Sequence, residues 1–260
     1  MVKGFLIDLD GTLYLGNQPV RGSREFVDFL KENNIPFLFL TNNSTRTPEQ
    51  VAEKLEKMGI QAHPSKIYTS ANTLADYLRE HYKGCHNAYV IGEDGVLREL
   101  ENLGWRIVKD YKEAEFVIVG LDREVTYEKL KQAVLAIQRG ATFIACNRDS
   151  SFPTPEGFLP GAGAIVNAIT TVVGVEPLVL GKPNEYIIRY AVKRLGVPLE
   201  NTAIVGDRLD TDIALGKKMG MVTILVLTGV NKNEEEIKEI KPDFVFEDVG
   251  ELWKNIYRLL

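Results

Sequence analysis

Cysteine, long hydrophobic runs and an excess of positive charge are all scarce in this chain of 260 residues. Its two cysteines, Cys85 and Cys146, form no CxxC pair and no disulfide framework, so we expect a protein of the reducing cytoplasm. No run of about 18 apolar residues occurs, and we therefore expect no membrane-spanning helix. The net charge of −5 argues against nucleic-acid polymers or anionic membranes as partners.

Short apolar runs alternate with helical patterns along the chain. Phe5–Leu9, Ile35–Leu40 and Ala203–Val205 read as buried strands, and Pro48–Met58 reads as a helix that Gly59 ends. This order predicts an α/β fold with a doubly wound parallel sheet that helices cover on both faces.

A second set of strand and helix patterns fills the middle of the chain. Phe116–Val119 and Thr142–Ala145 read as strands and Tyr127–Gln138 as a helix, and this segment contains none of the charged strand-end motifs described in the next paragraph. We therefore predict a core domain from residues 1–80 and 178–260, with an α/β cap domain inserted at residues 81–177.

Four apolar runs end in polar residues that suit phosphate chemistry. Parallel strands in open sheets present ligands at their carboxyl ends, so these four clusters are predicted to meet at one edge of the core sheet. The clusters are Asp8-Leu9-Asp10-Gly11-Thr12, Thr41-Asn42-Asn43-Ser44, Gly181-Lys182-Pro183 and Gly206-Asp207-Arg208-Leu209-Asp210-Thr211-Asp212.

These residue types can transfer a phosphoryl group. The Asp8 carboxylate can attack phosphorus when a divalent metal screens the charge repulsion, and Asp10 can protonate the leaving oxygen. Asp207 adds a carboxylate for Mg²⁺, which prefers oxygen ligands. Lys182 supplies a point charge for the phosphoryl oxygens, and the Thr41 hydroxyl with neighbouring amides can hold the same group.

The four motifs, in this order, resemble those of the haloacid dehalogenase superfamily over nearly the whole chain. The Thr41-Asn42-Asn43-Ser44 form and the large insert are similar to the NagD-like, nitrophenylphosphatase-like branch. The resemblance implies that Asp8 is the nucleophile, that Asp10 is the acid/base, and that Asp8, the Asp10 carbonyl and Asp207 hold Mg²⁺. The predicted phosphate-binding positions are Leu9, Asp10, Thr41, Asn42, Asn43 and Lys182.

Two further groups of residues are expected to support the site. Asp212 would orient a metal-bound water or Lys182. Asn147, Arg148 and Asp149 form a polar cluster directly after a predicted cap strand, and we expect them to help select the substrate.

The predicted function is therefore Mg²⁺-dependent hydrolysis of a small phosphorylated metabolite through an aspartyl-phosphate intermediate. Nucleotide monophosphates, sugar phosphates, phosphoglycolate and aryl phosphates all remain open as substrates. The alternatives are a phosphotransferase or mutase on the same scaffold and a phospho-aspartate signalling module, which the acid/base Asp10 and the large cap disfavour. A homodimer formed through the cap is a further expectation.

Overall fold

The computed structural model describes residues 1–154, 156–229 and 234–260, which group into two compact units. The first unit comprises Met1–Thr41, Pro48–Tyr68 and Lys182–Leu260, and the second comprises Asn42–Thr47 and Thr69–Gly181. The chain therefore passes from one unit to the other four times, after residues 41, 47, 68 and 181.

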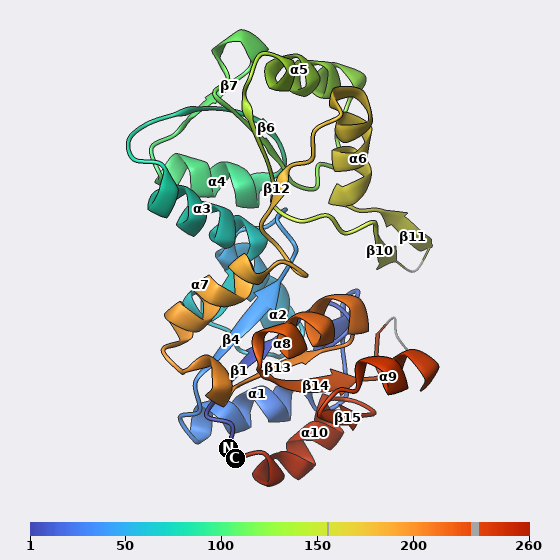
Figure 1. Ribbon diagram of the computed structural model, residues 1–260. Helices are drawn as coiled ribbons and strands as arrows, with labels where there is room; N and C mark the ends of the chain where they lie inside the picture. The colour runs from blue at the N-terminus through green and yellow to red at the C-terminus, as the bar shows by residue number, and fades with distance from the viewer. Residues whose placement is uncertain (155, 230–233) are drawn as a thin grey trace. The chain divides into compact units, whose positions relative to one another are not determined.

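A six-stranded sheet forms the centre of the first unit, in the order β15-β14-β13-β1-β4-β5 (Figure 1). The pairings from β15 across to β4 are all parallel. The strands are β1 (Gly4–Ile7), β4 (Phe37–Thr41), β5 (Ile67–Thr69), β13 (Thr202–Gly206), β14 (Val222–Val226) and β15 (Phe244–Phe246), with a short hairpin of β2 (Tyr14–Leu15) and β3 (Gln18–Pro19).

Helices cover both faces of this sheet, because successive residues of each strand point to opposite sides. In β1, Phe5 and Ile7 pack in a cluster with residues of α1 (Ser23–Glu32), α2 (Pro48–Lys57) and α10 (Val249–Asn255). Leu6 packs on the other face, with α7 (Glu185–Leu195) and α8 (Ala214–Met219). This unit also contains α9 (Glu234–Ile240). The predicted doubly wound parallel sheet is thus confirmed.

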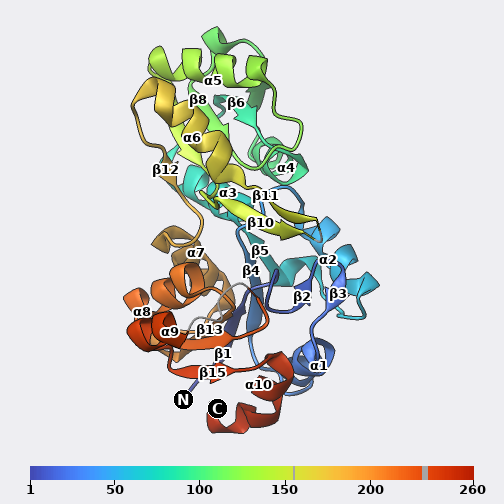
Figure 2. The ribbon, with the colours of Figure 1, turned by 90° about the vertical axis from the view of Figure 1, so that its right-hand side faces the viewer.

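The second unit contains its own five-stranded sheet, in the order β12-β9-β8-β6-β7, and every pairing is parallel. Residues of α5 (Tyr127–Gln138) and α6 (Ala162–Val173) share a hydrophobic cluster with one face of the sheet. Figure 2 labels both helices. The elements are α3 (Ser70–His81), β6 (Asn87–Ile91), α4 (Asp94–Asn102), β7 (Arg106–Val108), β8 (Phe116–Val119), α5 (Tyr127–Gln138), β9 (Thr142–Ala145), a hairpin of β10 (Ser151–Thr154) and β11 (Gly157–Pro160), α6 (Ala162–Val173) and β12 (Leu178–Val179).

The insert differs from the prediction in one strand and at its boundaries. Residues 178–180 fall within the predicted core domain, but β12 pairs with β9, so that Leu178 lies opposite Ile144 and Val179 opposite Ala145. Helix α3 also groups with the second unit, whereas the sequence placed the first boundary after residue 80. The second unit is therefore longer than the segment 81–177, and it includes the strand that leads to Lys182.

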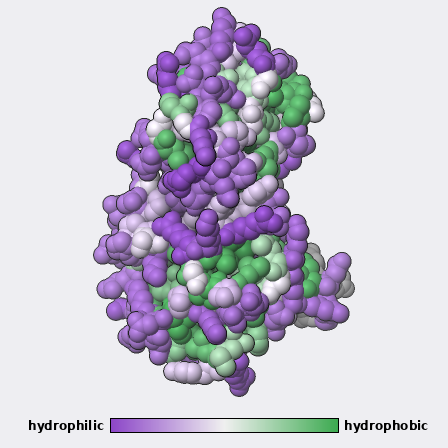
Figure 3. Space-filling model, turned by 60° about the vertical axis from the view of Figure 1, so that its left-hand side comes forward, coloured by the Kyte–Doolittle hydropathy of each residue, from purple (hydrophilic) through white to green (hydrophobic). Residues whose placement is uncertain are grey.

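Hydrophilic side chains cover most of the face drawn in Figure 3, with hydrophobic ones gathered in parts of it. The exposed large hydrophobic residues of the second unit include Tyr127, Phe158, Val172 and Val175. Pairing of two copies through this unit stays a prediction. Within the described ranges, no helix combines the length and the apolar character that crossing a membrane requires.

Candidate functional site

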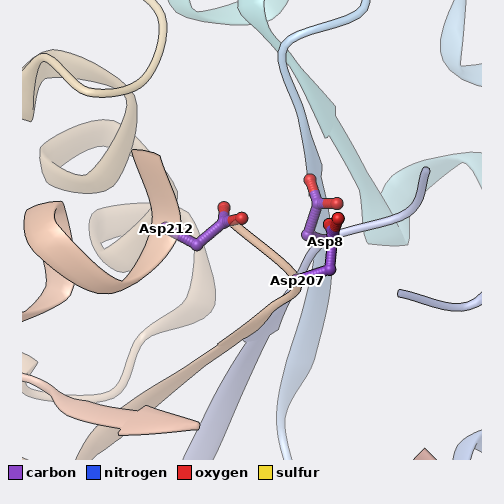
Figure 4. A group of neighbouring side chains, drawn as sticks. All are labelled: Asp8, Asp207 and Asp212. Atoms are coloured by element: carbon purple, nitrogen blue, oxygen red, sulfur yellow. The ribbon is translucent and has the colours of Figure 1, made fainter. Parts of the chain in front are cut away.

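Three buried carboxylates meet at the carboxyl end of the first unit's sheet (Figure 4). Asp8 follows β1, Asp207 follows the neighbouring strand β13, and Asp212 lies in a π-helical turn, Leu209–Ile213, that leads into α8. One oxygen from each carboxylate lies within 4.8 Å of the others. The sheet therefore brings together the first and fourth motifs, as the strand order requires.

Lys182 lies inside this cluster. Its Nζ donates to Oδ1 of Asp8 at 2.5 Å and to Oδ1 of Asp212 at 2.7 Å, and the lysine is only 4% exposed. Lys182 is the first residue of the returning chain, one position after the second unit ends at Gly181. The third motif thus reaches the site although its strand belongs to the other sheet.

The cluster is electrostatically unbalanced. Burial, followed by the negative charges of Asp212 and Asp207, raises the pKa of Asp8 well above its usual range, although the Lys182 ammonium acts in the opposite direction. Burial also disfavours the charged form of Lys182, but Asp212 and Asp8 outweigh this effect and raise the pKa of its ammonium group. Three ionised carboxylates beside one ammonium would leave two uncompensated negative charges.

Glycines allow the backbone to approach the carboxylates closely. A Cβ placed on Gly229 would lie 1.7 Å from Oδ2 of Asp207, and one on Gly11 would lie 2.5 Å from the same atom. Gly11 also has a φ of +91°, which a residue with a side chain rarely adopts. Thr12 donates to Oδ1 of Asp207 at 3.4 Å. Gly229 belongs to none of the four motifs in the sequence.

Asp10 does not join the three carboxylates. Its Oδ2 accepts a hydrogen bond of 2.9 Å from the Tyr14 hydroxyl, and its Oδ1 lies 3.9 Å from Nζ of Lys54. The side chain of Asp10 is 49% exposed. Tyr14 and Lys54 were missed because a tyrosine at the start of a two-residue strand and a helical lysine carry no motif of their own.

The second motif, Thr41-Asn42-Asn43-Ser44, lies where the chain passes from the first unit to the second. Thr41 is the buried last residue of β4, whereas Asn42 and Asn43 group with the second unit. The Asn42 side chain donates to Oδ1 of Asp149 at 3.0 Å, and Oδ1 of Asn43 accepts from the amide and hydroxyl of Thr45. Both predicted phosphate-binding asparagines therefore have partners within the second unit.

The predicted substrate-selecting residues fall into two environments. Asn147 is buried, and its side chain donates to the Asn42 carbonyl at 2.7 Å. The Arg148 guanidinium binds Asn167 of α6 and pairs with Glu176 at 2.5 Å. Asn147 and Asp149 therefore both contact Asn42, whereas Arg148 contacts Asn167 and Glu176.

Two family models match the chain. The model of haloacid dehalogenase-like hydrolases matches residues 5–106, and a second one, also HAD-hydrolase-like, matches residues 179–252. An acid sugar phosphatase from Staphylococcus aureus (strain MRSA252) is 44% identical over 96% of both chains. The chain therefore belongs to the haloacid dehalogenase (HAD) superfamily of hydrolases, which confirms the resemblance of its four motifs.

Solved structures identify the branch. The 4-nitrophenylphosphatase from Thermotoga maritima superposes with a TM-score of 0.90 at 38% identity, over 97% of both chains. NagD from Escherichia coli K-12 superposes with a TM-score of 0.88 at 34% identity, over 96% of this chain and 98% of its own. Within the superfamily, the chain is a phosphatase of the NagD-like branch.

Proposed function

We propose that the chain hydrolyses phosphomonoesters of small metabolites with the help of Mg²⁺, through a phosphoryl group carried on Asp8. The observation that carries this proposal is the buried contact of Asp8 with Lys182, in a cluster that contains two further aspartates. A nucleophilic carboxylate that is buried beside a fixed positive charge suits attack on an anionic phosphate.

The residues divide the reaction into two steps. The Asp8 carboxylate attacks phosphorus, and Asp10 gives a proton to the leaving oxygen. Water then attacks the phosphoryl group on Asp8, and Asp10 takes the proton back. Lys182, which Asp212 orients, stabilises the negative charge on the transferring oxygens. The predicted phosphate-binding positions, Leu9, Thr41, Asn42 and Asn43, belong to the same proposal.

The donor set fits a hard divalent cation. Two of the cluster's carboxylates, those of Asp8 and Asp207, would hold Mg²⁺ together with the Asp10 carbonyl. The excess of buried negative charge over Lys182 supports this assignment, since a divalent cation would compensate the two charges that the lysine leaves. When bound, Mg²⁺ would reduce the repulsion between Asp8 and the phosphate oxygens.

The names of the relatives support a proposal for the substrate class. Proteins similar to this chain over nearly its whole length are called acid sugar phosphatase and 4-nitrophenylphosphatase. We therefore favour sugar phosphates and similar small esters over larger substrates, and we assign the choice among them to the second unit. The proposed setting is the cytoplasm.

The decisive experiment compares wild type with Asp8→Asn on a panel of phosphomonoesters, in Mg²⁺ and in EDTA. We expect turnover in Mg²⁺ alone, its loss in Asp8→Asn, and a ³²P-labelled wild-type protein after acid quenching. Turnover that persists in Asp8→Asn would refute the proposed nucleophile. A stable phosphoprotein without phosphate release would favour the signalling module, and product that requires an alcohol acceptor would favour a phosphotransferase.

A further inference from the structure

Two residues outside the four motifs contact Asp10. The Tyr14 hydroxyl donates to Oδ2 of Asp10 at 2.9 Å, and the ammonium of Lys54 lies 3.8 Å from the centre of the Tyr14 ring. The same ammonium is 3.9 Å from Oδ1 of Asp10, which is beyond hydrogen-bonding distance. Asp10, Tyr14 and Lys54 therefore form a connected group.

The local fold explains why these residues meet. The positive φ of Gly11 turns the chain directly after Asp10, and the Gly11 amide donates to the Tyr14 carbonyl at 2.8 Å. This bond closes a tight turn that returns Tyr14 to Asp10 as β2 begins. Tyr14 is only 3% exposed, and Lys54 reaches its ring from α2.

We propose that Tyr14 and Lys54 are positioning residues for the acid/base Asp10, an inference that rests on the proposed function. The Tyr14 hydroxyl holds Oδ2, so that Oδ1 is the oxygen that exchanges the proton. Lys54 holds the Tyr14 ring through a cation–π contact and thereby keeps the hydroxyl aimed at Asp10.

In both chemical steps, Oδ1 of Asp10 is the atom that gives or takes the proton. In the first step, the bond from Asp8 to phosphorus forms, the bond from phosphorus to the leaving oxygen breaks, and the proton on Oδ1 moves to that oxygen. In the second step, a water oxygen bonds to phosphorus, the bond to Asp8 breaks, and the water proton returns to Oδ1. Tyr14 keeps its own proton throughout.

Leaving groups of different basicity test this assignment. p-Nitrophenolate leaves with little help from an acid, whereas phenolate, which is more basic, depends on protonation. We expect Tyr14→Phe to lower kcat/KM for phenyl phosphate by about 10-fold and for p-nitrophenyl phosphate by less than about 3-fold. Equal losses on the two esters, or no loss on phenyl phosphate, would overturn the inference.

Variants of Lys54 provide a second test of the inference, with a conservative substitution as the control. Lys54→Met should cause the same selective loss on phenyl phosphate, and Lys54→Arg should restore activity because a guanidinium also stacks on a tyrosine ring. If Lys54→Met leaves phenyl phosphate hydrolysis unchanged, the role of Lys54 is refuted. Thermal unfolding of each variant checks that the fold is retained.

The same assays separate this inference from the proposed function. If Asp8→Asn is inactive but Tyr14→Phe affects both esters equally, the inference fails and the proposed function stands. If Asp8→Asn still hydrolyses the esters, both the proposed function and this inference fail.

Discussion

Gly229 lies so close to Asp207 that any side chain at position 229 would occupy the space of the carboxylate. A Cβ there would be 1.7 Å from Oδ2 and 2.3 Å from Cγ of Asp207. Gly229, which follows β14, therefore confines a carboxylate that stands at the end of the neighbouring strand, β13.

The first prediction follows from this contact. Gly229→Ala should displace the Asp207 carboxylate, weaken Mg²⁺ activation by about 10–100-fold and lower kcat by up to about 100-fold. Mg²⁺ titrations of phosphatase activity would measure both effects. Gly92→Ala is the matched control, because its Cβ would meet Val96 at an ordinary 3.4 Å. Unchanged Mg²⁺ activation in Gly229→Ala would contradict the prediction.

The second prediction concerns the buried pair of Lys182 and Asp212. Lys182→Met should lower the free energy of unfolding by ~3–5 kcal/mol in EDTA, since it leaves buried carboxylates without their partner. Adding Asp212→Asn should recover part of this loss, because it removes one of the uncompensated charges.

Urea unfolding of the two single variants and the double variant gives the coupling between these residues, expected at ~0.5–3 kcal/mol. Arg98→Met provides the control, because Arg98 pairs with Glu101 at the surface and should contribute less than ~1 kcal/mol. Strictly additive losses for Lys182 and Asp212 would show that the two charges act independently.

The third prediction distinguishes the roles of Arg148 and Asp149, which are neighbours in the loop after β9. Asp149→Asn should change the ratio of kcat/KM between a sugar phosphate and p-nitrophenyl phosphate, because it alters the bond to Asn42. Arg148→Gln should leave this ratio within about 2-fold, since its guanidinium binds Asn167 and Glu176 instead. A larger change of this ratio in Arg148→Gln than in Asp149→Asn would reverse the assignment.

The fourth prediction concerns acid stability. Burial would raise the pKa of Asp243, but hydrogen bonds from Lys217 and Thr223 outweigh it and hold this pKa below its ordinary value. A carboxyl group whose pKa is lowered on folding stabilises the protein above the pKa of its unfolded state, about 3.9. That contribution is lost as the pH falls through the lower, folded-state pKa.

Asp243→Asn should therefore lower the melting temperature at pH 7, and the difference from wild type should shrink below about pH 4. Thermal unfolding across this pH range measures the difference, with the exposed Glu239→Gln as the control. A difference that stays constant down to pH 3 would show that the carboxylate charge of Asp243 plays no part.

Local patterns predicted most of the elements because their hydrophobic periodicity is strong. Helix α5 and strand β9 have the predicted bounds, and β1, β4 and β13 differ from theirs by a few residues at most. The order of the four motifs also sufficed to predict the superfamily, which the comparisons confirmed.

Features that depend on tertiary contacts were not predictable in the same way. The apolar run at Leu178–Leu180 fits either sheet, and only its pairing with β9 decides between them. Lys54 meets Asp10 and Tyr14 from a helix more than thirty residues further along the chain, so no local spacing could indicate it. Gly229 comes close to Asp207 only because β14 and β13 are neighbouring strands, so the sequence alone could not reveal this contact.

The four points at which the chain passes between the units suit the design of chimeric proteins. Asp8, Lys182, Asp207 and Asp212 all belong to the first unit, and the passages at 41/42, 47/48, 68/69 and 181/182 interrupt none of the contacts among them. Exchanging residues 42–47 and 69–181 together for those of a relative would transplant a complete second unit, including β12 and the partners of Asn42. Such chimeras would keep this chain's carboxylate cluster and take their loop at 147–149 from the donor.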